Sequence, residues 1–166
     1  WLLLCKSSSH LAHLDPHPGN FRWDEGSQTL WVLDWGSSAP LADARRRALC
    51  LVVVLLAGDA GDDDLLSDTA RTFGIRGDDG PQLAQLMRGI FNATTAHAAQ
   101  DALNAAAVDG ILSEVDDCVV PVVRCLATLG GLLQELQRRI RDDQQQDVPL
   151  SLATLWHPFA TLGLEA

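Results

Sequence analysis

The sequence predicts a mainly α-helical fold with one small β-hairpin near its start. From Leu41 onward, apolar residues recur at the three- and four-residue spacing of helices that bury one face. Before that point the chain is rich in helix-breaking residues, and two short apolar runs flank a turn that contains glycine. A length of 166 residues fits one domain with a core of its own.

The first segments of the chain are expected to be irregular or extended. Residues 1–12, an apolar run followed by serines, are interpreted as a helix end that runs into a loop. Residues 13–20 contain two prolines and a glycine, which predicts a loop. The runs 21–23 and 29–33 are expected to pair as the hairpin, and residues 13–36 are the only part in which strands are predicted.

Six helices are expected in the remainder. The second begins with Asp62, Asp63 and Asp64, where the positive end of the helix dipole favours acidic side chains. The fifth is long and amphipathic, and it ends in Arg138, Arg139 and Arg141. The expected ranges are 42–57, 62–73, 81–91, 100–115, 119–141 and 150–162, with a polar linker at 142–147.

Composition excludes several classes of protein. The chain carries 22 acidic against 12 basic residues and a net charge of −10, which argues against a nucleic-acid binder. The longest apolar run, 48–57, is about half the ~20 residues that span a bilayer, so no transmembrane segment is expected. No secretory signal is recognisable at the start. Cysteines 5, 50, 118 and 125 form no metal-binding pattern, which predicts buried thiols in a reducing compartment.

The chemically informative residues lie in two short segments. His13, Asp15 and Asn20 form a His-x-Asp-x4-Asn loop, and the hairpin then delivers Asp34 in an Asp-x-Gly sequence. Phosphoryl transfer from ATP needs a carboxylate that orients the attacking hydroxyl, and oxygen ligands for the divalent cation that bridges the phosphates. The spacing from Asp15 to Asn20 is that of a kinase catalytic loop.

These segments resemble a known signature. The sequence His-Leu-Asp-Pro-His-Pro-Gly-Asn at 13–20, followed by Leu-Asp-Trp-Gly at 33–36, is similar to that of the UbiB-like atypical kinases, also called the ABC-one (activity of bc-one complex) family. These are protein-kinase-like enzymes associated with coenzyme Q and prenyl-lipid metabolism. The likeness is specific in 13–36 and continues, with low specificity, through helices to about residue 160.

The resemblance implies a role for each site residue. Asp15 is the catalytic carboxylate, Asn20 and Asp34 are the metal ligands, and His13 is a structural histidine of the loop. The implied cofactors are Mg²⁺ and, in the intact enzyme, ATP. The implied partners are ATP or ADP and a small or lipid-like substrate, with peripheral membrane association and a weak preference for a mitochondrion or plastid. No role is assigned to His17.

The resemblance also implies an organisation in which one half of the kinase is missing. Residues 13–36 form the catalytic loop and metal-binding hairpin, and 37–166 form a helical C-terminal lobe. A kinase needs a strand lysine that contacts the phosphates. Lys6 is the only lysine, and it lies too close to the catalytic loop for that role. The chain is therefore interpreted as a C-terminal lobe without its N-terminal lobe, a fragment that is inactive alone.

Other interpretations stay open. Leu14 and Trp35 depart from the family pattern, and an Asp-Trp ending is also typical of small-molecule phosphotransferases of the aminoglycoside and choline kinase type. A non-catalytic, pseudokinase-type binding module is the alternative from another class.

Two further residue clusters allow more than one interpretation. His10, His13 and His17, with Asp15, have a spacing that could hold zinc. Arg45, Arg46 and Arg47 could contact anionic lipid headgroups, although pairing with Asp43 or Asp59 at a solvated helix start is the favoured interpretation.

Overall fold

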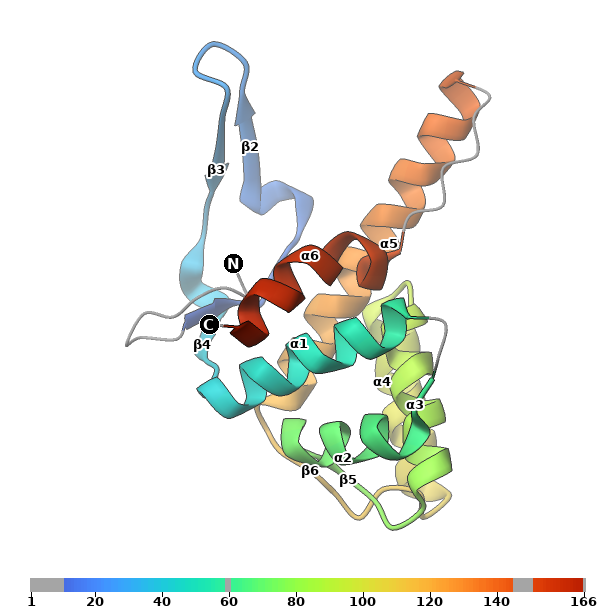
Figure 1. Cartoon of the computed structure of the whole chain (residues 1–166). Coiled ribbons are helices and arrows are strands. Elements are labelled where there is room, and N and C mark those ends of the chain that lie inside the picture. The colour runs from blue at the N-terminus through green and yellow to red at the C-terminus, as the bar shows by residue number, and fades with distance from the viewer. Residues whose placement is uncertain (1–10, 59–60, 145–150, 166) are drawn as a thin grey trace.

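The computed structural model describes residues 11–58, 61–144 and 151–165. Within them the protein is mainly α-helical, with six α-helices and three two-stranded antiparallel β-sheets, which confirms the expected class. Helices α1 to α4 and the first half of α5 form the body of the molecule, with α6 lying across it (Figure 1). The β2–β3 hairpin and the second half of α5 extend away from this body.

Five of the six helices begin and end within three residues of the expected positions. The observed bounds are α1 Asp43–Ala57, α2 Asp63–Phe73, α3 Gly80–Asn92, α4 Ala96–Val108, α5 Val119–Gln144 and α6 Leu152–Glu165. Asp62 caps α2 by accepting a hydrogen bond from the backbone N–H of Leu65 at 2.9 Å, as expected for an acidic helix start. The first three residues of the expected linker, 142–144, belong to α5, and 145–147 lie outside the described residues.

The prediction of a helix at 100–115 was wrong at both ends. α4 begins at Ala96 because the Thr95 side chain caps it, accepting from the backbone N–H of Ala98 at 3.0 Å. The helix ends before Gly110, which has a φ of +73° that favours glycine. Residues 114 and 115 then form a strand, which explains why the apolar pattern of this stretch continues beyond the helix.

Strands also occur outside 13–36, contrary to expectation. β1 (Leu11–His13) pairs with β4 (Ser38–Pro40), and β5 (Ile75–Arg76) pairs with β6 (Glu114–Val115). The hairpin itself is confirmed as β2 (Phe21–Asp24) and β3 (Thr29–Val32). Strands of two or three residues are too short to show alternation, so their pairing depends on tertiary contacts. The expected helix end at 1–12 lies outside the described residues up to 10, and residues 11 and 12 belong to β1.

The core is centred on α1, which packs against α6 on one side and α2 on the other, while α5 packs on α3 and α4. The middle of α1 contributes fully buried side chains, among them Leu49, Val52 and Val53. Burial of such side chains stabilises the fold by roughly 1.5–3 kcal/mol each. The core therefore lies beside the candidate loop without including it, and supplies a rigid platform for it.

Two adjacent glycines bring α5 close to the connection between α3 and α4. A Cβ atom at Gly130 would lie 2.6 Å from the carbonyl oxygen of Ala93, and one at Gly131 would lie 2.3 Å from that of Thr94. Real Cβ atoms do not approach a backbone oxygen so closely, so only glycine permits this packing. The close approach positions the first half of α5, which carries one wall of the candidate site.

Arg45, Arg46 and Arg47, at the start of α1, do not form one exposed basic surface. Arg46 is buried and pairs with Asp43 at 2.7 Å, as one interpretation expected. Arg45 pairs with Asp116 and lies 2.6 Å from the sulfur of Cys118, while Arg47 is exposed. Asp59 lies outside the described residues. Two of the three guanidinium groups are therefore engaged within the protein.

Two features relate to the predictions about cellular location: the cysteine thiols and the apolar helix α5. Among the described cysteines, Cys50, Cys118 and Cys125 are free thiols, the first and last of them buried; Cys5 lies outside the described residues. One described segment, Val119–Asp143, is long and apolar enough to cross a bilayer. A single helix of this kind is weak evidence, because core helices of soluble proteins satisfy the same criterion, and no transmembrane segment is firmly shown.

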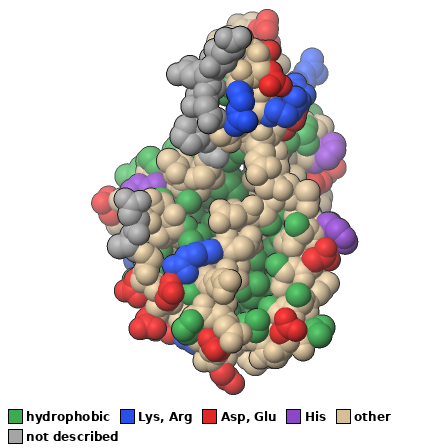
Figure 2. All heavy atoms as spheres, turned by 90° about the vertical axis from the view of Figure 1, so that its right-hand side faces the viewer, with side chains coloured by type: hydrophobic (Ala, Val, Ile, Leu, Met, Phe, Trp, Pro, Cys, Tyr) green, Lys and Arg blue, Asp and Glu red, His purple; other side chains and the backbone are tan. Residues whose placement is uncertain are grey.

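The outer half of α5 has a different surface from its inner half. Figure 2 shows basic and acidic side chains gathered at the end of the molecule where α5 protrudes. Glu135 bonds to Arg138 at 2.9 Å and to Arg139 at 2.7 Å, and Arg138 also bonds to Asp142 at 2.9 Å. These bonds lower the pKa of the Glu135 carboxyl to about 2. Ion pairs between residues three or four positions apart stabilise a helix, even where the helix does not pack against other elements.

Candidate functional site

The candidate site lies where the loop between β1 and β2 meets the end of the hairpin. The backbone N–H of Leu14 donates to the carbonyl of Ser37 at 3.3 Å, and that of Leu33 donates to the carbonyl of Asn20 at 2.8 Å. These two bonds, together with the β1–β4 pairing, hold segments 14–20 and 33–37 side by side. Residues that are thirteen or more positions apart in the chain are thereby brought to one place.

Asp15 and Asn20 are in direct contact. The amide nitrogen Nδ2 of Asn20 donates to both the backbone carbonyl and the carboxylate Oδ2 of Asp15, each at 3.1 Å. Because both partners are acceptors, the orientation of the amide is determined: the nitrogen faces Asp15 and the oxygen Oδ1 faces away. No described residue donates to this Oδ1, so it is available to a cation.

Asp34 has an unusual backbone conformation that presents its carboxylate. Its φ is +49°, in the left-handed region that non-glycine residues seldom adopt. The carboxylate oxygen Oδ1 accepts the backbone N–H of Gly36 at 3.1 Å, and a Cβ at position 36 would lie 3.0 Å from that same oxygen. Among the described residues no donor bonds to Oδ2 of Asp34, so this oxygen is also available to a cation.

His13 connects the two segments. Its ring atom Nε2 lies 3.2 Å from the carbonyl oxygen of Leu33 and 3.1 Å from that of Asp34, which requires the proton on Nε2. The ring also meets that of Trp35 edge-on, with a centroid distance of 5.0 Å, and lies 6.2 Å from that of Phe21. His13 is therefore a positioning residue, in agreement with the structural role expected for it.

His17 has a local role as well. Its Nδ1 accepts the backbone N–H of Gly19 at 3.0 Å and caps the short turn at 18–20. One ring nitrogen of each histidine is thus used within the loop, and His10, the third histidine of the zinc interpretation, lies outside the described residues. No group of three or more His, Cys, Asp or Glu side chains in the described part of the chain is placed to hold a metal ion.

The three predicted site residues are thus brought together to different degrees. Asp15 and Asn20 touch, whereas Asp34 is connected to the loop through its backbone, whose carbonyl oxygen lies 3.1 Å from Nε2 of His13. The carboxylate of Asp34 accepts from Gly36 instead. Carboxylate and amide oxygens are the hard ligands that Mg²⁺ prefers, and two such oxygens face away from protein partners. The donor set of Asn20 and Asp34 therefore fits Mg²⁺ in its chemistry.

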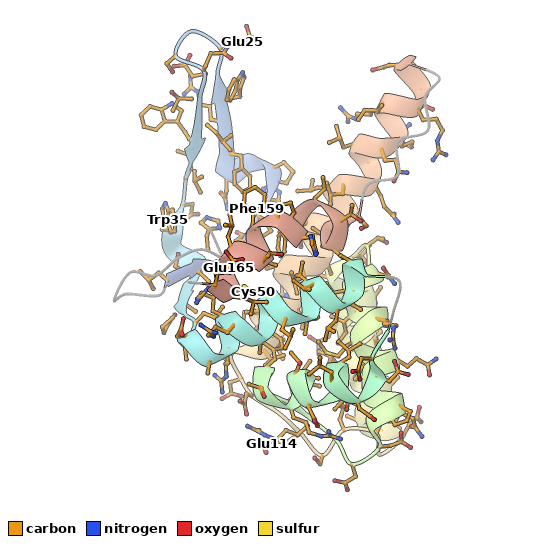
Figure 3. All side chains as sticks on the ribbon, in the orientation of Figure 1. Glu25, Trp35, Cys50, Glu114, Phe159 and Glu165 are labelled. Carbon is orange, nitrogen blue, oxygen red and sulfur yellow. The ribbon has the colours of Figure 1, made fainter. Side chains whose placement is uncertain are left out.

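An apolar cavity of about 310 Å³ adjoins the loop on the side of α5 and α6. His13, Phe21 and Trp35 contribute one wall. The opposite wall comes from Leu129 of α5 and Trp156 of α6, residues that the sequence did not single out. The only signal in the sequence that could have identified Leu129 is its spacing of four residues from Cys125, which places both on one apolar face of a helix. Figure 3 shows Trp35 at the foot of the hairpin and Phe159 on α6.

Cys125 lies between this cavity and the loop. Its sulfur is 3.8 Å from the backbone oxygen of His13, and it also lines the apolar cavity. Burial, with a smaller contribution from the negative charge of Asp15, raises the pKa of its thiol to about 12. Cys125 is therefore a protonated packing residue at neutral pH and is not a nucleophile.

The hairpin leaves large apolar side chains in solvent. The β2–β3 pairing places Trp23 opposite Leu30 on one face and Arg22 opposite Trp31 on the other. Trp23, Leu30 and Trp31 are each more than half exposed, and Leu33 and Trp35 are more than 40% exposed. Large apolar side chains are therefore exposed on both faces of the hairpin.

Comparisons with known proteins add nothing to this geometry. No family model matches the sequence, and neither a curated protein nor a solved structure was found to be similar to it.

Proposed function

We propose that the chain is the C-terminal lobe of a UbiB-like atypical kinase or ATPase that uses ATP and Mg²⁺. The single observation that carries this proposal is the contact between Asp15 and Asn20, in which the amide nitrogen of Asn20 faces Asp15 and its amide oxygen is left without a donor among the described residues. In this proposal Asp15 accepts the proton of the attacking hydroxyl, and Asn20 and Asp34 hold the cation. The cation, when bound, neutralises charge on the phosphates.

The exposed hairpin supports a position for the N-terminal lobe that this proposal requires. Trp31 and Leu33 would be covered by the lobe that brings the phosphate-contacting lysine. The chain has one lysine, Lys6, outside the described residues and a few positions before the catalytic loop. We therefore propose that the 166-residue chain does not hydrolyse ATP by itself.

The apolar cavity supports a small or lipid-like substrate. Its walls are formed by aromatic and aliphatic side chains, and His13 and Trp35, which flank the candidate cation ligands, belong to it. Pockets of this composition and of about 300 Å³ or more are typical of sites for apolar small molecules. A substrate bound there would lie next to the loop that carries Asp15.

Cation binding tests the proposal directly. Titration of the chain with Mn²⁺ as a paramagnetic substitute for Mg²⁺ is expected to broaden the NMR signals of residues 15, 20 and 34 selectively. Asp34→Asn is expected to weaken this binding at least tenfold, whereas Asp24→Asn is expected to leave it unchanged. Asp24 is a suitable control because it too accepts a bond from a glycine N–H, Gly26 at 3.0 Å, in an exposed turn of the same hairpin.

Two outcomes would overturn parts of the proposal. Equal Mn²⁺ affinity in the Asp34→Asn variant would remove the assigned cation site. Hydrolysis of ATP by the purified chain, abolished by Asp34→Asn, would contradict the statement that the chain is inactive alone.

Two alternative functions lead to different expected results in these experiments. A pseudokinase-type module would keep the exposed apolar hairpin as a binding surface and show no cation binding at Asn20 and Asp34. The edge contact between Trp35 and His13 fits an Asp-Trp ending and favours, as a second candidate, a small-molecule phosphotransferase. That function would bind Mn²⁺ in the same way but would not bind apolar ligands in the cavity.

A further inference from the structure

Arg124 on α5 has no acidic partner among the described residues, in a protein that has acids in excess. Among the residues that the structure describes, most arginines form ion pairs, and Arg22, Arg47 and Arg124 have none. In a chain with 22 acidic and 12 basic residues, pairing is readily available. An arginine that forms no internal ion pair is free to bind an external anion.

Arg124 differs from the other two in its location. It lines a cavity of about 420 Å³ that Asp15, the candidate catalytic carboxylate, also lines. Ser37, three residues after Asp34, is also part of the wall. This cavity shares no lining residue with the apolar one. A molecule in it would contact both a guanidinium group and Asp15.

The remaining walls favour an anion as well. Ala96 is the first residue of α4, so the positive end of that helix dipole faces the cavity. The hydroxyl of Thr128 donates to the carbonyl oxygen of Arg124 at 2.9 Å, which fastens the side chain of Thr128 to the helix and leaves the guanidinium as the strongest free donor. Asp15, the sole carboxylate among the lining residues, is the one group there that repels an anion.

We propose that Arg124 binds an oxyanion, phosphate or carboxylate, carried by the acceptor substrate, and so positions an acceptor hydroxyl at Asp15. This inference rests on the proposed function. In the transfer step the hydroxyl oxygen forms a bond to the terminal phosphorus of a nucleoside triphosphate, while the bond from that phosphorus to the bridging oxygen breaks. The nucleoside diphosphate leaves with the electron pair, and the hydroxyl proton passes to the Asp15 carboxylate.

Guanidinium groups suit this role because their planar fork of N–H donors matches the geometry of phosphate and carboxylate oxygens. Because Arg124 is exposed and forms no ion pair with a described residue, its replacement is not expected to unfold the protein. Arg47, also exposed and unpaired but on α1 outside the cavity, is the matched control for the loss of one positive charge.

The test titrates the 166-residue chain with inorganic phosphate and, separately, with acetate, following backbone amides by NMR. The amides of residues 96 and 124–128 are expected to shift with saturation, and Arg124→Gln is expected to weaken the binding at least fivefold. Arg47→Gln is expected to retain it. Tighter phosphate binding would indicate a phosphate-bearing acceptor and tighter acetate binding a carboxylate-bearing one, and either supports the site.

The inference is overturned if Arg124→Gln and Arg47→Gln weaken binding equally, since that shows a net-charge effect only, or if the cavity amides do not shift. Asp34→Asn separates this inference from the proposed function, because it removes the cation ligand and leaves Arg124 in place. If the chain binds phosphate through Arg124 but no Mn²⁺, the anion site stands and the phosphoryl-transfer assignment is wrong.

Discussion

The side-chain N–H groups of Asn20 donate hydrogen bonds to two oxygens of Asp15, the backbone carbonyl and the carboxylate Oδ2, each at a donor–acceptor distance of 3.1 Å. The two residues are five positions apart and flank two prolines, so the amide closes the loop across its ends. The carboxylate that is proposed to accept a proton is therefore held by the same side chain that is proposed to bind the cation.

Asn20→Ala is expected to destabilise the protein by about 1 kcal/mol, because it removes hydrogen bonds that are partly buried. Asn20→Asp is expected to cost more at neutral pH, since it replaces a donor with a second carboxylate facing Oδ2 of Asp15. Chemical denaturation measures both. A variant Asn20→Asp as stable as the wild type would show that the Asn20–Asp15 contact does not form.

Arg46 connects α1 to α6, and its replacement tests that connection. Its Nη1 donates to the carbonyl oxygen of Gly163 at 3.0 Å, and the guanidinium is buried. Arg46→Leu is expected to cost about 2 kcal/mol, because the carbonyl loses its buried donor, and to speed amide exchange in α6. Arg47→Leu, at the exposed neighbouring position, is expected to change stability by less than about 0.5 kcal/mol. Equal effects would contradict the docking role of Arg46.

Gly131→Ala is expected to destabilise the protein by about 1–3 kcal/mol, because the new Cβ would overlap the carbonyl oxygen of Thr94 and force α5 away from the α3–α4 connection. Gly89→Ala is the matched control. Gly89 lies inside α3, and a Cβ there would have no atom within 4 Å. That variant is expected to stabilise the helix by up to about 1 kcal/mol. Thermal unfolding measures both, and a stabilised Gly131→Ala variant would show that the close approach is absent.

Acid is expected to weaken the protein through Asp116. Hydrogen bonds and charge from Arg76, with the charge of Arg45, hold the pKa of the Asp116 carboxyl below its usual value. A carboxyl with a lowered folded-state pKa adds stability above its unfolded pKa of about 4, and this stability is lost as the pH falls through the lower folded value. Asp116→Asn is therefore expected to reduce stability at pH 7 and to flatten its decline in acid.

Asp78→Asn serves as the control for the predicted loss of stability in acid, because Asp78 is exposed and forms no ion pair with a described residue. It is expected to keep the wild-type pH dependence. Urea denaturation at intervals between pH 7 and pH 2 provides the measurement, and an unchanged slope in Asp116→Asn would assign the acid sensitivity to other carboxyls.

The apolar cavity can be filled without removing any polar group. Leu129→Trp is expected to weaken binding of an uncharged lipophilic fluorophore, N-phenyl-1-naphthylamine, at least tenfold, because the larger ring occupies the cavity. Leu136→Trp makes the same change seven residues later on α5, where the side chain is 48% exposed, and is expected to have no effect. Equal binding by both variants would place the fluorophore elsewhere, for example on the exposed hairpin.

The local elements could be predicted because their signals are local. Acidic residues at 62–64 predicted the start of α2, and helix breakers at 16–19 predicted the loop. The helix at 100–115 was misplaced because a cap at Thr95 and a turn at Gly110 outweighed the apolar pattern. The strands β1, β4, β5 and β6 were missed because strands of two or three residues form only when a distant partner is present.

The sequence by itself determined the mainly helical class of the fold and the loop that contains Asp15 and Asn20, because breakers and caps act within a few residues. The catalytic role of that loop, and of Asp34 beside it, stays a prediction. Tertiary structure alone decided what surrounds them. It placed Arg124 in the wall of the cavity that contains Asp15, and Leu129 and Trp156 in the wall of the other. Those residues lie more than 100 positions from the loop, and only the packing of α5 and α6 on α1, α3 and α4 brings them to it.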